Sequence, residues 1–213
     1  MPKVSSQLKT RTPKGAKGEK TKKIINDAIL KQVHNKGFNQ VTLKDICDET
    51  GLTIGAFYFH YVNKEKALEE VAAMCVRERQ EDAIKALDQP TFEKEIYSVI
   101  KAYITNYADP DLHEQTRMLR YMIPTSDVVN QIYYSTRGKI IDHIIERTVL
   151  EKQSKGMTTG KERVLVEYLY CALGDFMYTL YFEKEPKLVK VAGSVEALAK
   201  KLTRMWYTTL IQG

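Results

Sequence analysis

Cysteines, long apolar runs and turn dipeptides are scarce in this sequence. Only three of its 213 residues are cysteines, an odd number without a Cys-x-x-Cys pair. This usage argues against a disulfide framework and favours a reducing compartment, so we expect a cytoplasmic protein. No run of about 18 apolar residues occurs, the length that a membrane-spanning helix needs. We therefore expect neither export nor a membrane partner.

Motifs for catalysis and metal binding are also scarce. The sequence contains no Gly-x-Ser-x-Gly, no paired carboxylates on one helix face and no cofactor fingerprint. Residues 156–161 are similar to a phosphate loop but are one residue short and follow no strand, so we interpret them as a helix connection. The four histidines lack the i, i+4 spacing of metal ligands on a helix. We predict no catalytic residue, no metal, no cofactor and no enzyme.

Alternating apolar patterns flanked by hairpin dipeptides are absent as well, which argues against a β-sheet. Apolar residues instead recur at i, i+3, i+4 and i+7 along most of the chain. The sequence therefore predicts an all-α protein with about nine helices. Their expected ranges are about 20–36, 43–50, 54–61, 64–87, 92–107, 112–122, 128 to near 156, 161–183 and 194–211.

One stretch near the amino terminus predicts three helix starts separated by tight turns. Thr42 can cap the first helix, and Asp45, three residues on, can return a hydrogen bond to the Thr42 amide. Gly51 can take the positive φ that ends this helix. Thr53 and Asn63 can cap the next two helices. This order is typical of a helix-turn-helix, whose second helix lies in the major groove of DNA.

The same stretch resembles the amino-terminal domain of the tetracycline-repressor (TetR) family of bacterial transcriptional regulators. The matching residues are Thr42, Ile46, Gly51, Gly55, Tyr58, Tyr61, Lys64 and Leu68. The departures are Cys47 and Thr50 for alanine, Leu52 for valine, Thr53 for serine and Tyr61 for phenylalanine. The resemblance covers roughly residues 20–70. It implies a helix-turn-helix domain at 20–66 and a helical effector-binding and dimerisation domain at 67–213.

The second helix of the motif is expected to read bases. With Phe57 and Tyr61 turned inward, two apolar side chains and a glycine face outward, where they can meet thymine methyl groups in the major groove. The alternative is that Phe59 packs on a neighbouring helix. The resemblance implies that Tyr58 and Lys64 contact DNA phosphates. The full candidate set for DNA binding is Thr42, Lys44, Thr53, Ile54, Gly55, Ala56, Tyr58, Phe59, His60 and Lys64.

The positive charge of the chain lies at its amino terminus. Residues 1–23 hold eight basic residues against one acidic residue, which gives +7 and leaves −1 for all the rest. Their Pro, Gly, Ser and Lys content predicts a disordered basic arm at 1–19. The arm is either a solubilising tail or, next to a helix-turn-helix, a segment that contacts DNA phosphates.

Tyrosine and methionine are frequent in the carboxy-terminal helices, where they suit either a ligand pocket or an ordinary core. The resemblance favours a pocket for a small, largely apolar effector. Its candidate residues are Tyr103, Tyr107, Met118, Met122 and Phe176. The helix at 64–87 continues without a linker from the helix-turn-helix toward this pocket, so a ligand there could tilt it.

The last two helices carry more apolar surface than one small domain needs, which predicts a two-fold homodimer. We thus expect a ligand-responsive regulator, in this family most often a repressor, released from a palindromic operator of double-stranded DNA by a small-molecule effector. The alternatives are an all-helical enzyme that uses the tyrosine-rich cavity and a DNA-binding regulator without a small-molecule ligand.

Overall fold

The computed structural model describes residues 15–212, which form ten α-helices and no strand. None of these described helices combines the length and apolar character that a bilayer span needs. The all-α prediction is confirmed. The helices are α1 (Ala16–Lys36), α2 (Leu43–Thr50), α3 (Ile54–His60), α4 (Lys64–Lys85), α5 (Phe92–Ala108), α6 (His113–Thr125), α7 (Asp127–Ser154), α8 (Glu162–Tyr178), α9 (Pro186–Ala192) and α10 (Val195–Gln212).

The predicted helix starts and turn of the helix-turn-helix are confirmed. The Thr42 hydroxyl accepts a hydrogen bond from the Asp45 amide and the Asp45 carboxylate accepts one from the Thr42 amide, which completes a capping box. Thr53 caps α3 and Asn63 caps α4 in the same way. Gly51 ends α2 in the left-handed region at φ 69°, where a side chain would be strained.

Helix α1 begins earlier than predicted, at Ala16 instead of Lys20. Lysine and glutamate are good helix formers, and Glu19 in the first turn stabilises the positive end of the helix dipole. Residues 16–19 therefore belong to the helix and not to the arm. Gly15 directly precedes the helix, and residues 1–14 of the predicted arm lie outside the described residues.

Two proline positions also correct the predicted helix pattern. Helix α6 does not end before Pro124 but includes it, because the proline lies in the last turn and costs only one intrahelical hydrogen bond. Pro186 does not simply divide the last two predicted helices. It is the first residue of the additional helix α9, where a missing N–H is tolerated, and Glu185 caps that helix.

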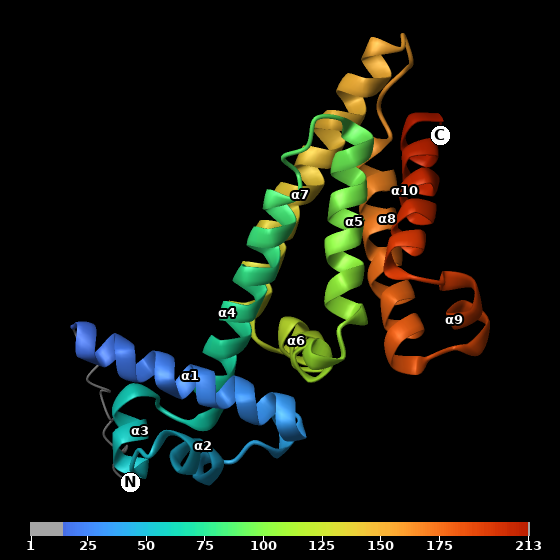
Figure 1. Ribbon diagram of the computed structural model, residues 1–213. Helices are drawn as coiled ribbons and strands as arrows, with labels where there is room; N and C mark the ends of the chain where they lie inside the picture. Colours follow the sequence, from blue (N-terminus) through green and yellow to red (C-terminus); the bar gives the residue numbers. More distant parts are fainter. Residues whose placement is uncertain (1–14, 213) are drawn as a thin grey trace, which may run out of the picture.

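The helices form two connected modules (Figure 1). Helix α1 lies across α2 and α3, whereas α4 leaves this module and runs beside α7. Helices α5, α8 and α10 pack together on the other side, and α6 contacts α1, α4 and α7 near the junction. Residues of α4 therefore reach from the helix-turn-helix into the carboxy-terminal bundle.

Each module has its own hydrophobic core. The amino-terminal core contains Phe57 and continues along α4 as far as Val76, past the boundary predicted at residue 66. It also takes in Met118 and Leu119 from α6 and Val129 from α7. The carboxy-terminal core is built from α5, α7, α8 and α10, and Ala83 of α4 packs against it. Helix α4 thus contributes to both cores.

Candidate functional site

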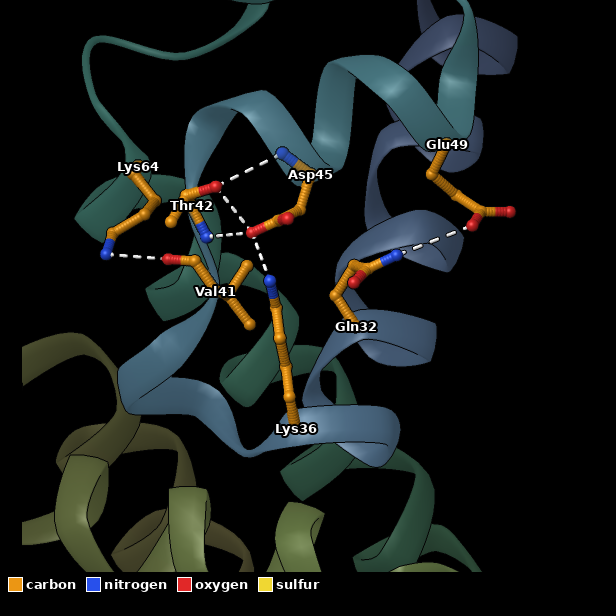
Figure 2. Close-up of polar contacts among 7 residues, drawn as sticks. All are labelled: Gln32, Lys36, Val41, Thr42, Asp45, Glu49 and Lys64. Atoms are coloured by element: carbon orange, nitrogen blue, oxygen red, sulfur yellow. Dashed lines mark hydrogen bonds and ion pairs between the residues drawn. The ribbon is translucent and has the colours of Figure 1, made fainter.

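A network of charges and hydrogen bonds fixes the start of α2. The Asp45 carboxylate, already bonded to the Thr42 amide and hydroxyl, forms an ion pair with Lys36 at the end of α1 (Figure 2). The hydrogen bonds from Lys36 and Thr42 hold the pKa of Asp45 well below its usual range. Gln32 of α1 donates to Glu49 near the other end of α2. These contacts bind α2 to α1 at both ends.

Buried aromatic residues anchor α3 from its inner side. Phe57 is fully buried, and the ring of Tyr61, directly after the helix, is tilted against it with a ring-centroid distance of 5.6 Å. The Tyr61 hydroxyl donates to the Asn26 side chain at 2.5 Å and also lies 3.2 Å from Glu70. Burial raises the pKa of Tyr61, so its hydroxyl stays protonated and remains a donor. The orientation of α3 is therefore set by the core.

The outer side of α3 is apolar, as the sequence predicts. Ile54 is 55% exposed and Phe59 is 49% exposed, so Phe59 is not covered by a neighbouring helix. Gly55 is exposed between them and Ala56 is half-buried. His60 is also half-buried, its Nδ1 has no partner among the described residues, and burial lowers its pKa, which favours the neutral ring. The outer side of α3 is therefore exposed and carries no charged group.

Candidate phosphate ligands flank that surface. Tyr58 is nearly half exposed. Lys64 starts α4 and donates from Nζ to the Val41 carbonyl at 2.9 Å, so this lysine closes the loop before α2 (Figure 2). Lys44 is exposed on α2. The hydroxyls of Thr42 and Thr53 serve as helix caps in the free protein.

The carboxy-terminal module contains a cavity of about 440 Å³ between α4, α5, α6, α7 and α8. Two of the five predicted pocket residues, Tyr103 and Tyr107, line it. Met118 instead lies fully buried in the amino-terminal core, against which Met122 also packs. Phe176 packs on the carboxy-terminal core. Polar residues that line the cavity but are outside the predicted set of five include Arg79, Gln80, Arg120, Tyr133, Arg137 and Tyr170.

Tyrosines form one wall of the cavity. The rings of Tyr103 and Tyr107 stack with a centroid distance of 5.3 Å, and Tyr170 meets Tyr103 edge to face at 5.9 Å. Burial raises the pKa of Tyr103 well above its usual value and that of Tyr133 to about 12. These phenols are protonated at neutral pH and can donate hydrogen bonds. Within residues 15–212, no group of three or more acidic, histidine or cysteine side chains is placed to bind a metal ion.

Comparison with known proteins identifies the amino-terminal module. Residues 25–71 match the family model described as bacterial regulatory proteins of the tetR family. The helix-turn-helix is therefore a TetR-family DNA-binding domain. The match covers α2 and α3 completely and ends within α4. The TetR resemblance inferred from the sequence is confirmed, whereas a search of curated proteins finds no match.

Solved structures share the fold of this protein over most of its length. A protein described as a transcriptional regulator from Pseudomonas aeruginosa PAO1 is 15% identical with a TM-score of 0.71, covering 92% of both chains. A TetR-family transcriptional regulator from a Rhodococcus species is 11% identical with a TM-score of 0.64, covering 90% of this chain and 99% of that one. The fatty acid degradation regulator FadR from Bacillus halodurans is 16% identical with a TM-score of 0.60, covering 91% and 96%. Identities this low establish a shared fold alone.

The apolar face of α8 and α10 that the sequence predicts to form a dimer has an exposed part and a buried part. Val164 and Tyr168 of α8 are 73% and 70% exposed, and Met205 of α10 is half exposed. Ala172 of α8, a further apolar residue of this face, is also exposed. The other apolar residues of the face are covered to various degrees by the chain itself. The buried ones are Leu169, Met177, Leu198, Trp206 and Leu210, while Phe176, Val195 and Leu202 pack partly buried against the same core.

Proposed function

We propose that this TetR-family chain is a homodimeric repressor that binds a palindromic operator and leaves it when a small, largely apolar effector fills the cavity. The observation that supports this most directly is the outer side of α3. A core-anchored, capped helix carries Ile54 and Phe59 on a surface without charge, inside a module that matches a family of DNA-binding regulators. The similarity of the chain to transcriptional regulators also supports a function without enzymatic activity.

Helix α3 has the chemistry to read bases in the major groove. Ile54, Ala56 and Phe59 can contact thymine methyl groups, and Gly55 permits close approach of the backbone. Tyr58, Lys44 and Lys64 lie on the flanking surface, where they can position the helix on phosphates. Phosphate contacts supply affinity for any sequence, so the apolar contacts on α3 would carry the preference for one operator.

The exposed apolar residues of α8 and α10 support a two-fold dimer. Val164, Tyr168 and Met205 lie on helices that pack together in the carboxy-terminal bundle. If this face packs on the same face of a second chain, α8 and α10 of both chains would form a four-helix interface. Two recognition helices held by such a dimer bind successive half-sites only at a spacing of about 34 to 36 Å.

Helix α4 is the proposed connection between effector and DNA. It begins next to α3, contributes to both cores, and presents Val76, Arg79 and Gln80 to the cavity. A ligand that prefers a different tilt of α4 would change the spacing of the two α3 helices. A preference of about 1 to 3 kcal/mol corresponds to roughly 5- to 150-fold weaker DNA binding.

A gel shift with the DNA upstream of the gene tests DNA binding directly. We expect a single retarded species whose affinity falls steeply with salt, because phosphate contacts release counterions. The switch is then tested by titrating an effector with and without operator, since DNA must weaken effector binding by the factor by which effector weakens DNA binding. Equal effector affinities in the two titrations exclude the switch. A regulator without a small-molecule ligand passes the gel shift and binds no effector.

A further inference from the structure

The charged residues of the cavity are mainly basic. Three arginines line it, Arg79 from α4, Arg120 from α6 and Arg137 from α7, whereas Asp175 is the only acidic residue among the described lining residues. The Asp175 carboxylate lies 3.6 Å from Arg120 and is almost fully exposed to solvent. The lining of the cavity therefore carries more positive than negative charge.

The three arginines differ in how their charges are compensated. Arg137 has a close partner, because its Nη2 donates to Glu167 at 2.7 Å. Arg120 has the more distant Asp175. Arg79 has no carboxylate within 4 Å among the residues that the structure describes. Its Nη2 donates only to neutral oxygens, those of Gln115 at 2.5 Å and Thr116 at 3.0 Å, and its Nε is buried without a partner.

An uncompensated guanidinium in this position is costly to bury. Burial lowers the pKa of Arg79, which reflects the unfavourable desolvation of its charge. A buried cation is normally paired with an acidic group, because the low dielectric strengthens both the penalty of an isolated charge and the attraction of a pair. The chain supplies no such group at Arg79, so a ligand that brings an anion into the cavity would complete the pair.

The rest of the cavity wall suits an amphipathic molecule. The phenols of Tyr103, Tyr133 and Tyr170 are protonated donors that can share a carboxylate with an arginine. The carboxamide oxygen of Gln80 is buried and has no described partner, so it can accept from a hydroxyl or N–H group of the ligand. The apolar part of the wall consists of Val76, Ala83, Val99, Ala102, Leu119 and Ile123.

We propose that the cavity binds an amphipathic carboxylic acid, whose carboxylate pairs with Arg79 and whose apolar body lies against the aliphatic and tyrosine wall. This inference rests on the proposed effector site and defines its ligand class. A cavity of about 440 Å³ is in the size range of small-molecule sites. The acid is a more specific form of the small, largely apolar effector that the TetR resemblance implies, with a charged head group at one end.

The position of Arg79 also gives the acid a route to the DNA-binding domain. Arg79 belongs to α4, and its present partners Gln115 and Thr116 belong to α6. A carboxylate that accepts hydrogen bonds from Arg79 competes with these two oxygens and so weakens the link between α4 and α6. Because α6 packs on α1 as well as on α4, the change reaches the helix-turn-helix.

Matched pairs of ligands test the proposal on the full chain. Isothermal titration at pH 7.5 compares decanoate with decan-1-ol and 4-phenylbutyrate with 4-phenylbutan-1-ol, so that each pair differs mainly in the charged head. We expect at least one acid to bind roughly 10- to 100-fold more tightly than its alcohol, the range of a charge-assisted hydrogen bond. Equal affinities within both pairs, or no binding by either acid, would overturn the proposal.

Variants assign the preference to Arg79. Arg79→Met removes the charge at similar length and should abolish the advantage of the acid, whereas Arg79→Lys should keep part of it. Arg77→Met is the matched control, because Arg77 is exposed on the same helix and does not line the cavity. Circular dichroism verifies folding, and an undiminished acid preference in folded Arg79→Met refutes the assignment. A parallel gel shift with the wild-type protein separates the two proposals. If the wild type does not bind DNA, the proposed regulator is refuted, but the preference for the acid can still be measured.

Discussion

Phe57 and Phe59 are two positions apart on α3 but lie in opposite environments. Phe57 is fully buried in the amino-terminal core, whereas half of the Phe59 surface is exposed. The same change to alanine should therefore have two different effects. Phe57→Ala should lower the free energy of unfolding by about 3 to 5 kcal/mol, the usual cost of removing a buried aromatic ring. Thermal and denaturant unfolding measure this loss.

Phe59→Ala should leave the free energy of unfolding almost unchanged, because the removed ring is already half exposed. It should instead weaken binding to the preferred operator by about 1 to 3 kcal/mol and alter the preference at one base position. Fluorescence anisotropy with single-base operator variants measures both effects. Val189→Ala is the control, since Val189 is equally exposed on α9, far along the chain from α3. A uniform loss across all sequences would contradict base reading by Phe59.

Asp45 predicts a pH dependence of stability. Its folded pKa is depressed below the ordinary value near 3.8 by Lys36 and Thr42, so its contribution is present above pH 4 and is lost as the pH falls through the folded pKa. The stability difference between wild type and Asp45→Asn should therefore shrink on acidification. Denaturant unfolding at pH 7, 5 and 3 measures it. Asp48→Asn, an exposed change on the same helix, provides the baseline. A difference that stays constant over this range would contradict the assignment.

At the residue scale, the sequence predicts local hydrogen bonding well and tertiary surroundings poorly. Thr42, Thr53 and Asn63 each cap a helix through the amide three residues away, so neighbouring residues in the sequence determine their roles. Arg79 looks like any other charged residue of a helix. Its burial depends on how α4, α6 and α7 pack, and no local pattern encodes that packing.

At the scale of helices, α4 behaves as a shared structural element. Its first half, to Val76, lies in the amino-terminal core, and Ala83 near its end packs against the other core. We expect the wild type to unfold in one cooperative transition. The double change Glu81→Gly and Asp82→Gly, at exposed positions between the cores, should cost roughly 1 kcal/mol of helix stability relative to the wild type and roughly 2 kcal/mol relative to alanine at both positions. It should split or broaden the transition.

Differential scanning calorimetry measures the shape of that transition. The matched control is Glu81→Ala with Asp82→Ala, which removes the same side chains but keeps a strong helix former at both positions. The alanine variant should unfold in a single transition like the wild type. Equally sharp single transitions in both double variants would show that α4 does not carry the cooperativity between the two modules.

The helices also show which elements can be predicted from the sequence and which cannot. The sequence predicts nine of the ten described helices. Periodicity finds the long ones, whereas caps and the glycine turn find the short α2 and α3. The seven-residue α9 has too few turns for periodicity, and Pro186 looks like a helix terminator until the cap at Glu185 is known. Met118 and Met122 have the predicted apolar character, but the rotation of α6 turns them toward the amino-terminal core.

At the scale of the whole molecule, the apolar faces of α8 and α10 predict a dimer. Light scattering at micromolar concentration should give twice the chain mass of 24.5 kDa. The pair of changes Val164→Glu and Met205→Glu should yield a folded monomer, since charges are then buried at the interface without partners. Val189→Glu with Val191→Glu, both exposed on α9, is the control and should remain dimeric. A wild-type monomer, or a dimer that survives the first pair of changes, would contradict the assigned interface.

The amino-terminal core draws Met118, Leu119 and Val129 from far along the chain, which constrains how this protein could exchange parts with its relatives during evolution. A recombination point just after residue 71 preserves every residue of the family match. It nevertheless leaves the transferred segment with a foreign α6 and α7 against its core. The segment that matches the family model is therefore shorter than the set of residues that pack together in the amino-terminal core. A working chimera requires either compatible residues at these three positions or a transferred segment that extends through the beginning of α7.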